Sequence, residues 1–196
     1  ASGITVLNTV QGGMSTIHGA INANEGIGHL IISNPNGMLF DGATFTTAAD
    51  CNVSLNATPM YADGFDENGK IKIVDKRYTK EELDPLNPYA GGYNLVKVEL
   101  KDSKFNVGGD FSIVAPNINI YNSTFGLNGG KGTLKLATAD GSTFSGGWIT
   151  GNDNNVGRDT DPRSLAGLKQ INLRAIEVDG NVEIVAASKG DRKSVV

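Results

Sequence analysis

Few residues in this chain of 196 could carry out acid–base, nucleophilic or metal chemistry. There are two histidines, His18 and His29, and one cysteine, Cys51. We expect both histidines on the surface. No spacing of metal-ligating residues fits a metal site, so no metal and no cofactor is predicted. Cys51 lies in a strand-like stretch with no histidine nearby in the sequence, which favours a buried free thiol over a nucleophile.

One group of charged residues between positions 151 and 168 has the types needed to cleave a polysaccharide. Carboxylates and an arginine base can perform that reaction, and the group consists of Asp153, Arg158, Asp159 and Asp161. The segment is rich in Gly and Asn, so solvated loop charges explain the group more simply. The spacing of Asp153, Asn155 and Gly157 is faintly similar to a calcium loop, but no acid closes that loop at the required position. We predict no catalytic residue and keep a glycan-active enzyme as the alternative.

Composition narrows the class of protein further. The chain has 26 glycines, 19% charged residues and a formal net charge of −4. Gly, Asn and Ser compete poorly for helix interiors, so strands and turns are favoured. No basic stripe suggests a nucleic-acid surface, and no apolar stretch is long enough for a transmembrane helix. A single cysteine excludes an intramolecular disulfide.

The residues that must position any site follow a pattern of short alternating strands. An apolar residue, a spacer and a second apolar residue recur, and each pair is followed by Gly, Pro or Asn. Phe105 and Phe125 are 20 residues apart, which is about one turn of a β-solenoid. We therefore predict a single-stranded β-solenoid and keep a Greek-key sandwich as the alternative. The clearest inward pairs are Phe105 and Val107, Phe111 and Ile113, Ile118 and Ile120, Phe125 and Leu127, and Leu134 and Leu136.

Two segments interrupt this pattern inside what we interpret as one domain, residues 1–196. In residues 62–93, Asn68-Gly69 predicts a hairpin and residues 79–82 a helical turn. Residues 151–168 are predicted to be a second loop excursion. The flanking sequence, with no leader at its start and no closing element at its end, leads us to expect truncation at both ends.

The sequence Asn34-Pro35-Asn36-Gly37 separates two apolar runs. Asn at the first position, Pro at the second and Gly at the fourth are typical of a type I turn. Leu30 and Ile32 precede this turn, and Met38 and Phe40 follow it. We predict a corner that keeps alternate residues inward, with a hairpin tip as the alternative.

Residues 4–48 strongly resemble the two-partner secretion domain of filamentous-haemagglutinin-type exoproteins, also called the haemagglutination activity domain. The resemblance rests on several motifs and is looser between residues 94 and 148, where it covers Asn106 to Pro116. The motifs are Leu7-Asn8, Gly12-Gly13, the Ser15–Gly19 strand, the Leu30–Ile32 apolar run, and Asn34 to Gly37 followed by Met38–Phe40. Members of the family usually carry further residues upstream, including a capping segment and an Asn-Pro-Asn-Leu motif, which this sequence lacks.

This resemblance implies a right-handed parallel β-helix with a role in secretion. It implies a targeting and fold-nucleating domain of a large exported adhesin-like protein, with Asn34, Pro35, Asn36 and Gly37 as its motif. The implied partner is an outer-membrane β-barrel transporter with POTRA domains, reached through the periplasm of a Gram-negative cell. The full-length protein would be secreted or displayed at the cell surface, where it could bind a host receptor or glycan. We expect no membrane insertion, no enzyme activity and a monomer, and a passive stalk or biofilm-matrix segment remains a further alternative.

Overall fold

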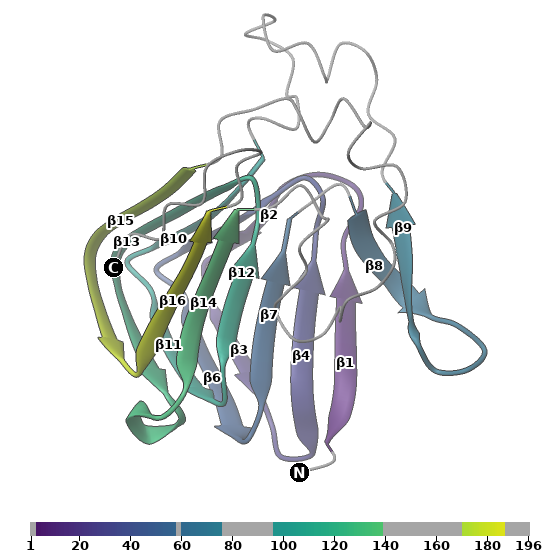
Figure 1. The fold of residues 1–196 in the computed structure, drawn as a ribbon, viewed down its shortest axis with the longest axis horizontal. Coiled ribbons are helices and arrows are strands. Elements are labelled where there is room, and N and C mark those ends of the chain that lie inside the picture. Colours follow the sequence, from purple (N-terminus) through teal and green to yellow (C-terminus); the bar gives the residue numbers. More distant parts are fainter. Residues whose placement is uncertain (1–2, 58–59, 76–95, 139–169, 187–196) are drawn as a thin grey trace, which may run out of the picture.

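The computed structural model describes residues 3–57, 60–75, 96–138 and 170–186. Within these ranges the protein is all-β, as predicted, and the strands curl around a common interior (Figure 1). The exception to strand and loop is a short 3₁₀ turn, Asn128–Gly130. No helix formed by the described residues is long and apolar enough to span a bilayer.

Sheet A forms one wall and contains six strands, all in parallel pairs. These strands lie across the sheet in the same order as they occur along the chain. Each time the chain returns to sheet A, it adds the next strand beside the previous one. The strands are β1 (Ile4–Thr9), β4 (Ile27–Ser33), β7 (Asn52–Asn56), β12 (Phe111–Val114), β14 (Thr133–Thr138) and β16 (Asn181–Ala186).

Sheet B contains eight strands and is bent into two halves. In the first half β2 (Ser15–Ile17), β5 (Met38–Asp41) and β10 (Lys97–Lys101) follow one another; in the second half β3 (Ala20–Ala23), β6 (Thr44–Ala49) and β11 (Lys104–Gly108) do so. The long strands β13 (Asn117–Leu127) and β15 (Gln170–Asp179) run through both halves. They turn the bend at Asn122 and Ala175, whose φ angles of 44° and 53° are left-handed.

Parallel registers stack like residues on like residues in the interior. Phe45 pairs with Phe105, and Phe105 pairs with Phe125, so the last two residues, 20 positions apart in the sequence, lie side by side on adjacent parallel strands. The rings of Phe105 and Phe125 are stacked, with centroids 4.9 Å apart. All ten inward residues predicted between Phe105 and Leu136 are buried.

The segment Asn34–Gly37 is a corner, as predicted, because it joins two strands that do not pair with each other. β4 lies in sheet A and β5 in sheet B. Leu30 and Ile32 before the corner, and Met38 and Phe40 after it, are all buried in the same core. The hairpin alternative for this segment is therefore wrong.

The hairpin predicted at Asn68-Gly69 is present. Strand β8 (Met60–Phe65) pairs antiparallel with β9 (Ile71–Asp75), and the Gly69 N–H donates to the Asp66 carbonyl at 3.0 Å. The hairpin forms a separate two-stranded sheet, which begins two residues before the predicted boundary at residue 62. The helical turn predicted for residues 79–82 and the excursion of residues 151–168 lie outside the described residues.

Burial differs from the sequence prediction at the ends and on the outer side of sheet A. Ile4 on the first strand is 69% exposed, and Leu173, Val182 and Ile184 on the last strands are 36–48% exposed. Ile31 and Val114 alternate with the inward residues of their strands, yet both are buried. The middle of sheet A is therefore buried on both faces. An alternating pattern of apolar residues predicts burial on one face only.

Candidate functional site

The buried amide of Asn34 organises the corner that the sequence singled out. Its Nδ2 donates to the Gly13 carbonyl at 2.7 Å and lies 2.8 Å from the Ser15 hydroxyl oxygen. Its Oδ1 accepts the Asn36 backbone N–H at 2.9 Å. The side chain therefore uses both amide hydrogens and its oxygen inside the protein, and it joins this corner to the preceding pass of the chain.

The rest of the motif closes the turn. The Gly37 N–H donates to the Asn34 carbonyl at 3.1 Å, which is the hydrogen bond of a four-residue turn. Asn36 does not have a positive φ, and this excludes a type II turn. Asn36 also donates from Nδ2 to the Gln11 carbonyl at 3.0 Å, while Pro35 is buried.

Gly37 meets two separate requirements for glycine. Its φ is +99°, a conformation that residues with a Cβ rarely adopt. A Cβ at this position would also lie 2.7 Å from the Lys97 carbonyl oxygen on the neighbouring strand β10. The glycine therefore both ends the turn and allows the next pass to lie against it.

This corner can hold two strands at a fixed angle, but Asn34 cannot present its amide to a partner. Three of the four motif residues, Asn34, Pro35 and Gly37, are buried, and Asn36 is partly exposed. The donors and the acceptor of this buried amide are already paired. Removing any one of these partners would lower the free energy of unfolding of the protein. The described contacts of Asn34 therefore serve to stabilise the fold.

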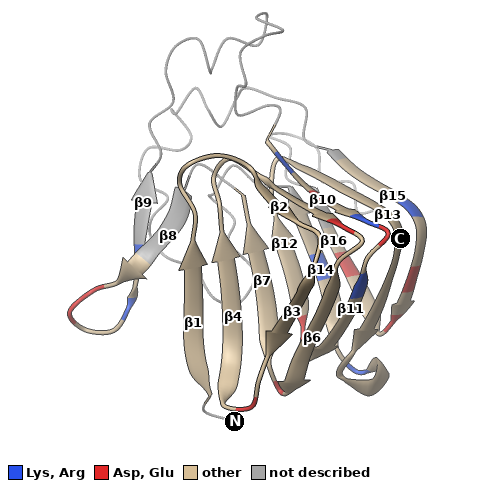
Figure 2. Cartoon of the chain, turned by 180° about the vertical axis from the view of Figure 1, so that it is seen from behind, with Lys and Arg blue, Asp and Glu red and all other residues tan. Residues whose placement is uncertain are grey.

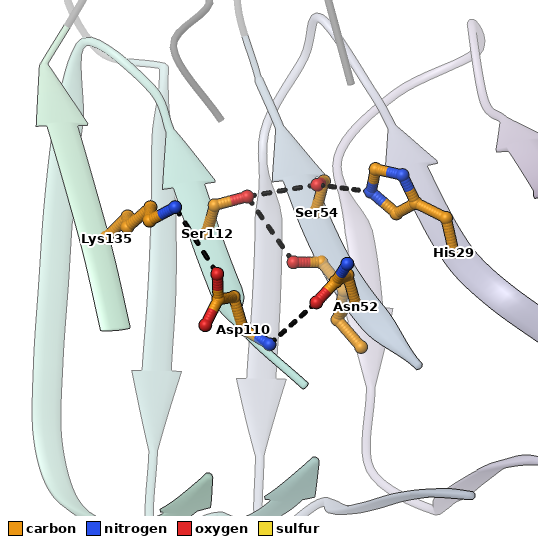
Figure 3. A pocket seen from close by; sticks show the side chains of 7 residues that line it. His29, Asn52, Ser54, Asp110, Ser112 and Lys135 are labelled. Atoms are coloured by element: carbon orange, nitrogen blue, oxygen red, sulfur yellow. Dashed lines mark hydrogen bonds and ion pairs between the residues drawn. The ribbon is translucent and has the colours of Figure 1, made fainter. Parts of the chain in front are cut away.

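A second group of polar side chains lies on the outer side of sheet A (Figure 3). His29 Nε2 is 2.8 Å from the Ser54 Oγ, and the Ser112 hydroxyl donates to Ser54 at 3.0 Å. Lys135 Nζ lies 3.3 Å from the Asp110 carboxylate. These residues come from β4, β7, β12 and β14 and the loop before β12, so the parallel register brings them together from distant parts of the sequence.

His29 lies on the outer side of sheet A, where it is partly buried and not fully exposed as predicted. Burial lowers the pKa of His29 to about 4, because the charged ring would lose its hydration. The ring is therefore neutral at pH 7, and Nε2 can accept the Ser54 hydroxyl hydrogen. Nothing in the sequence indicates this pairing, since the two residues are 25 positions apart and meet only through the register of β4 and β7.

The His29–Ser54 pair does not have the geometry of a nucleophile and its base. Ser54 is 1% exposed, so a substrate carbonyl could not reach its oxygen. Among the described residues no carboxylate is hydrogen-bonded to His29 to orient the ring, as a catalytic triad requires. The adjoining pocket has a volume of about 80 Å³, well below the roughly 300 Å³ of a small ligand site.

Among the described residues, the other candidates from the sequence, His18 and Cys51, belong to neither of these two groups of polar side chains. His18 is exposed, as predicted, and its Nδ1 is 3.1 Å from the Asp41 carbonyl oxygen. Cys51 is a buried free thiol, also as predicted, and burial raises its pKa. The described residues contain no group of His, Cys, Asp or Glu arranged to hold a metal. The charged group Asp153, Arg158, Asp159 and Asp161 lies outside the described residues.

Sequence reasoning missed a row of buried serines at the bend of sheet B. The Ser103 hydroxyl accepts the Ala43 N–H at 3.0 Å, and the Ser123 hydroxyl accepts the Ser103 N–H at 3.2 Å. Each hydroxyl also donates to the carbonyl two residues before it, at Lys101 and Tyr121. Ser103 and Ser123 are 20 residues apart, as are Phe105 and Phe125, and this shared spacing could have predicted the row.

No family model, no curated protein and no solved structure matches this chain. The assignment of function therefore depends on the sequence motifs and the geometry described above.

Proposed function

We propose that this chain is a right-handed parallel β-helix that acts as the secretion-targeting and fold-nucleating domain of a large exported adhesin-like protein. The observation that carries the proposal is the corner at Asn34–Gly37. The sequence motif that resembles the secretion domains coincides with a turn whose buried amide and left-handed glycine hold sheet A and sheet B together. The parallel registers of both sheets support the β-helix.

The cognate transporter recognises the domain through its periplasmic POTRA domains. Since Asn34 is buried, the motif contributes to recognition by fixing the shape of the first passes of the chain. The exposed parts of these passes then provide the contact surface. Export places the protein at the cell surface or in the medium, and the domain itself performs no catalysis.

Secretion through the cognate transporter tests this proposal. The chain is expressed with that transporter, and its secreted and cell-retained amounts are compared. We expect the wild type to be secreted, and Asn34→Ala and Gly37→Val to lower the secreted fraction. Asn22→Ala and Gly12→Val are the matched controls, because Asn22 is exposed and a Cβ on Gly12 would contact nothing within 4 Å. Equal secretion of all five proteins would contradict a role for the corner.

A binding experiment separates this function from a passive stalk. Purified POTRA domains of the transporter are immobilised and presented with the wild-type chain. The proposal predicts saturable binding, whereas a stalk or matrix segment would show none. No observation among the described residues favours the alternative of a glycan-active enzyme. That activity is tested directly by incubating the chain with acidic polysaccharides and measuring the reducing ends that are released.

A further inference from the structure

Three Asn-Gly pairs occur in the sequence, and all three lie in described turns. They are Asn36-Gly37, Asn68-Gly69 and Asn128-Gly129. An asparagine followed by glycine can lose its side-chain amide without an enzyme, because the next backbone nitrogen attacks the Asn Cγ and glycine has no Cβ to hinder the attack. The attack needs a backbone N–H that is not held in a hydrogen bond and an asparagine side chain that can turn toward it. The three turns differ in how well they meet these requirements.

The Asn36-Gly37 pair is held on both sides of the reacting bond. The Gly37 N–H donates to the Asn34 carbonyl at 3.1 Å, and the Asn36 Nδ2 donates to the Gln11 carbonyl at 3.0 Å. Gly37 is also buried, and its Cα faces the Lys97 backbone. The attack at this pair requires the corner to open first, so Asn36 is protected in the folded protein.

The Asn68-Gly69 pair, at the tip of the β8–β9 hairpin, is held in part. The Gly69 N–H donates to the Asp66 carbonyl at 3.0 Å. The Asp66 carboxylate accepts the N–H groups of Asn68 and Lys70 at 2.8 and 2.9 Å. Both residues of the pair are exposed. The attacking nitrogen is therefore engaged, although solvent reaches the side chain.

The Asn128-Gly129 pair lies in the exposed turn that joins β13 to β14 (Figure 1). Two hydrogen bonds close this turn, from the Lys131 N–H to the Asn128 carbonyl at 3.2 Å and from the Gly132 N–H to the Leu127 carbonyl at 3.0 Å. Both donors come after the pair. The Gly129 N–H lies near the start of the 3₁₀ turn and has no acceptor among the described residues, and the Asn128 side chain makes no hydrogen bond with them.

The backbone conformation of this turn also favours the reaction. Asn128 has a φ of 46°, and Gly129 and Gly130 have φ angles of 56° and 85°. A left-handed asparagine carries a steric cost, whereas two consecutive glycines change conformation with little hindrance. The peptide bond between Asn128 and Gly129 can therefore rotate toward the side chain more easily than one packed against a neighbouring strand.

We propose that Asn128 is a site of spontaneous deamidation in the folded protein. The backbone nitrogen of Gly129 forms a bond to the Asn128 Cγ, the bond from Cγ to Nδ2 breaks, and ammonia leaves with the proton of the Gly129 N–H. Water then opens the resulting succinimide ring at one of its two carbonyl groups. The product is an aspartate or an isoaspartate, in which the main chain runs through the side-chain carbon. This inference does not rest on the proposed function.

Either product places a new negative charge beside acidic residues. The Asp179 Oδ1 lies 2.9 Å from the position that a Cβ on Gly130 would occupy. Glu177 lies on the same strand, and Figure 2 shows acidic residues in red on β15. Like charges repel, so deamidation should destabilise this turn in addition to changing the net charge of the protein.

Peptide mapping by mass spectrometry tests the proposal with the full 196-residue chain. The protein is kept folded in a mildly alkaline buffer, circular dichroism verifies the fold, and the converted fraction of each asparagine is followed over time. We expect Asn128 to react first and Asn68 more slowly. Asn36 should react at least about tenfold more slowly than Asn128, because two hydrogen bonds must break before the attack.

The same chain unfolded in urea is the control, because the three pairs should then react at similar rates. Asn128→Gly removes the site and relieves the left-handed asparagine, so most of the isoaspartate formed by the folded chain should disappear in this variant. Equal rates at Asn36 and Asn128 in the folded chain would overturn the proposal. An Asn128 that stays intact while the unfolded chain reacts would do the same, as would an unchanged amount of isoaspartate in Asn128→Gly.

Discussion

Replacing Asn34 with alanine removes three hydrogen bonds from a fully buried side chain. The lost contacts are those to the Gly13 carbonyl, the Ser15 hydroxyl and the Asn36 N–H, at 2.7, 2.8 and 2.9 Å. Each such bond contributes roughly 1 kcal/mol net to stability, so Asn34→Ala should lower the free energy of unfolding by about 3 kcal/mol. For a domain of this length that loss corresponds to a fall in Tm of roughly 6–12 °C.

Urea unfolding followed by circular dichroism measures the loss. Asn36→Ala is the matched comparison, because its side-chain bond to the Gln11 carbonyl is exposed and is expected to contribute about 1 kcal/mol or less. Asn34→Asp adds a second comparison: it keeps an acceptor for Asn36 but buries a negative charge against the Gly13 carbonyl, and it should be at least as unstable as Asn34→Ala at pH 7. A loss below about 1 kcal/mol for Asn34→Ala, or equal losses at Asn34 and Asn36, would refute the view that the buried amide holds the corner.

Three further predictions concern other positions. Gly37→Val should cost more than about 2 kcal/mol, since a φ of +99° and the Lys97 carbonyl 2.7 Å from a Cβ both oppose a side chain; urea unfolding measures it. Ala175→Gly should raise stability by roughly 0.5 kcal/mol, because Ala175 has a φ of +53°, and differential scanning calorimetry would detect the higher Tm. His29 has its pKa lowered from 6.5 to about 4 by burial, so the unfolded chain binds the proton more tightly than the folded protein. Stability should therefore fall as pH drops from about 6.5 to 4, by up to roughly 3 kcal/mol, and His29→Gln should flatten that part of the curve.

Each of these three predictions has a control variant and an outcome that would contradict it. Gly12→Val should be nearly neutral, and a similar loss at both glycines would remove the special role of Gly37. Ala20→Gly should destabilise, because Ala20 has no positive φ, so stabilisation by both glycines would point to an effect other than backbone strain. An unchanged pH dependence in His29→Gln would assign the acid sensitivity to other groups.

The interior of the fold could be predicted from the sequence because its signal is local. Apolar residues two positions apart, separated by turn residues, mark the inward side of each short strand, and Phe105 to Leu136 follow that rule throughout. The corner at Asn34 was also local, because four consecutive residues specify it. The burial of Cys51 could be predicted because it lies in a strand-like stretch with no histidine nearby in the sequence.

The contacts and burial that the sequence did not predict depend on the register between strands and on the burial of the outer face of sheet A. His29 and Ser54 meet only because β4 and β7 lie side by side, and nothing near either residue in the sequence indicates the other. Ile31 and Val114 are buried on the outer side of sheet A, where an alternating pattern predicts exposure. Ile4 is apolar but 69% exposed, and it lies on the outermost described strand of sheet A.

X-ray crystallography of the chain is the decisive test of the parallel stacking and of the Asn34–Gly37 corner. We expect Phe45, Phe105 and Phe125 on adjacent parallel strands in one column, with Asn34–Gly37 as a corner between two sheets. Antiparallel strands in two facing layers, or Asn34–Gly37 at the tip of a hairpin, would contradict both the fold and the secretion role that depends on it.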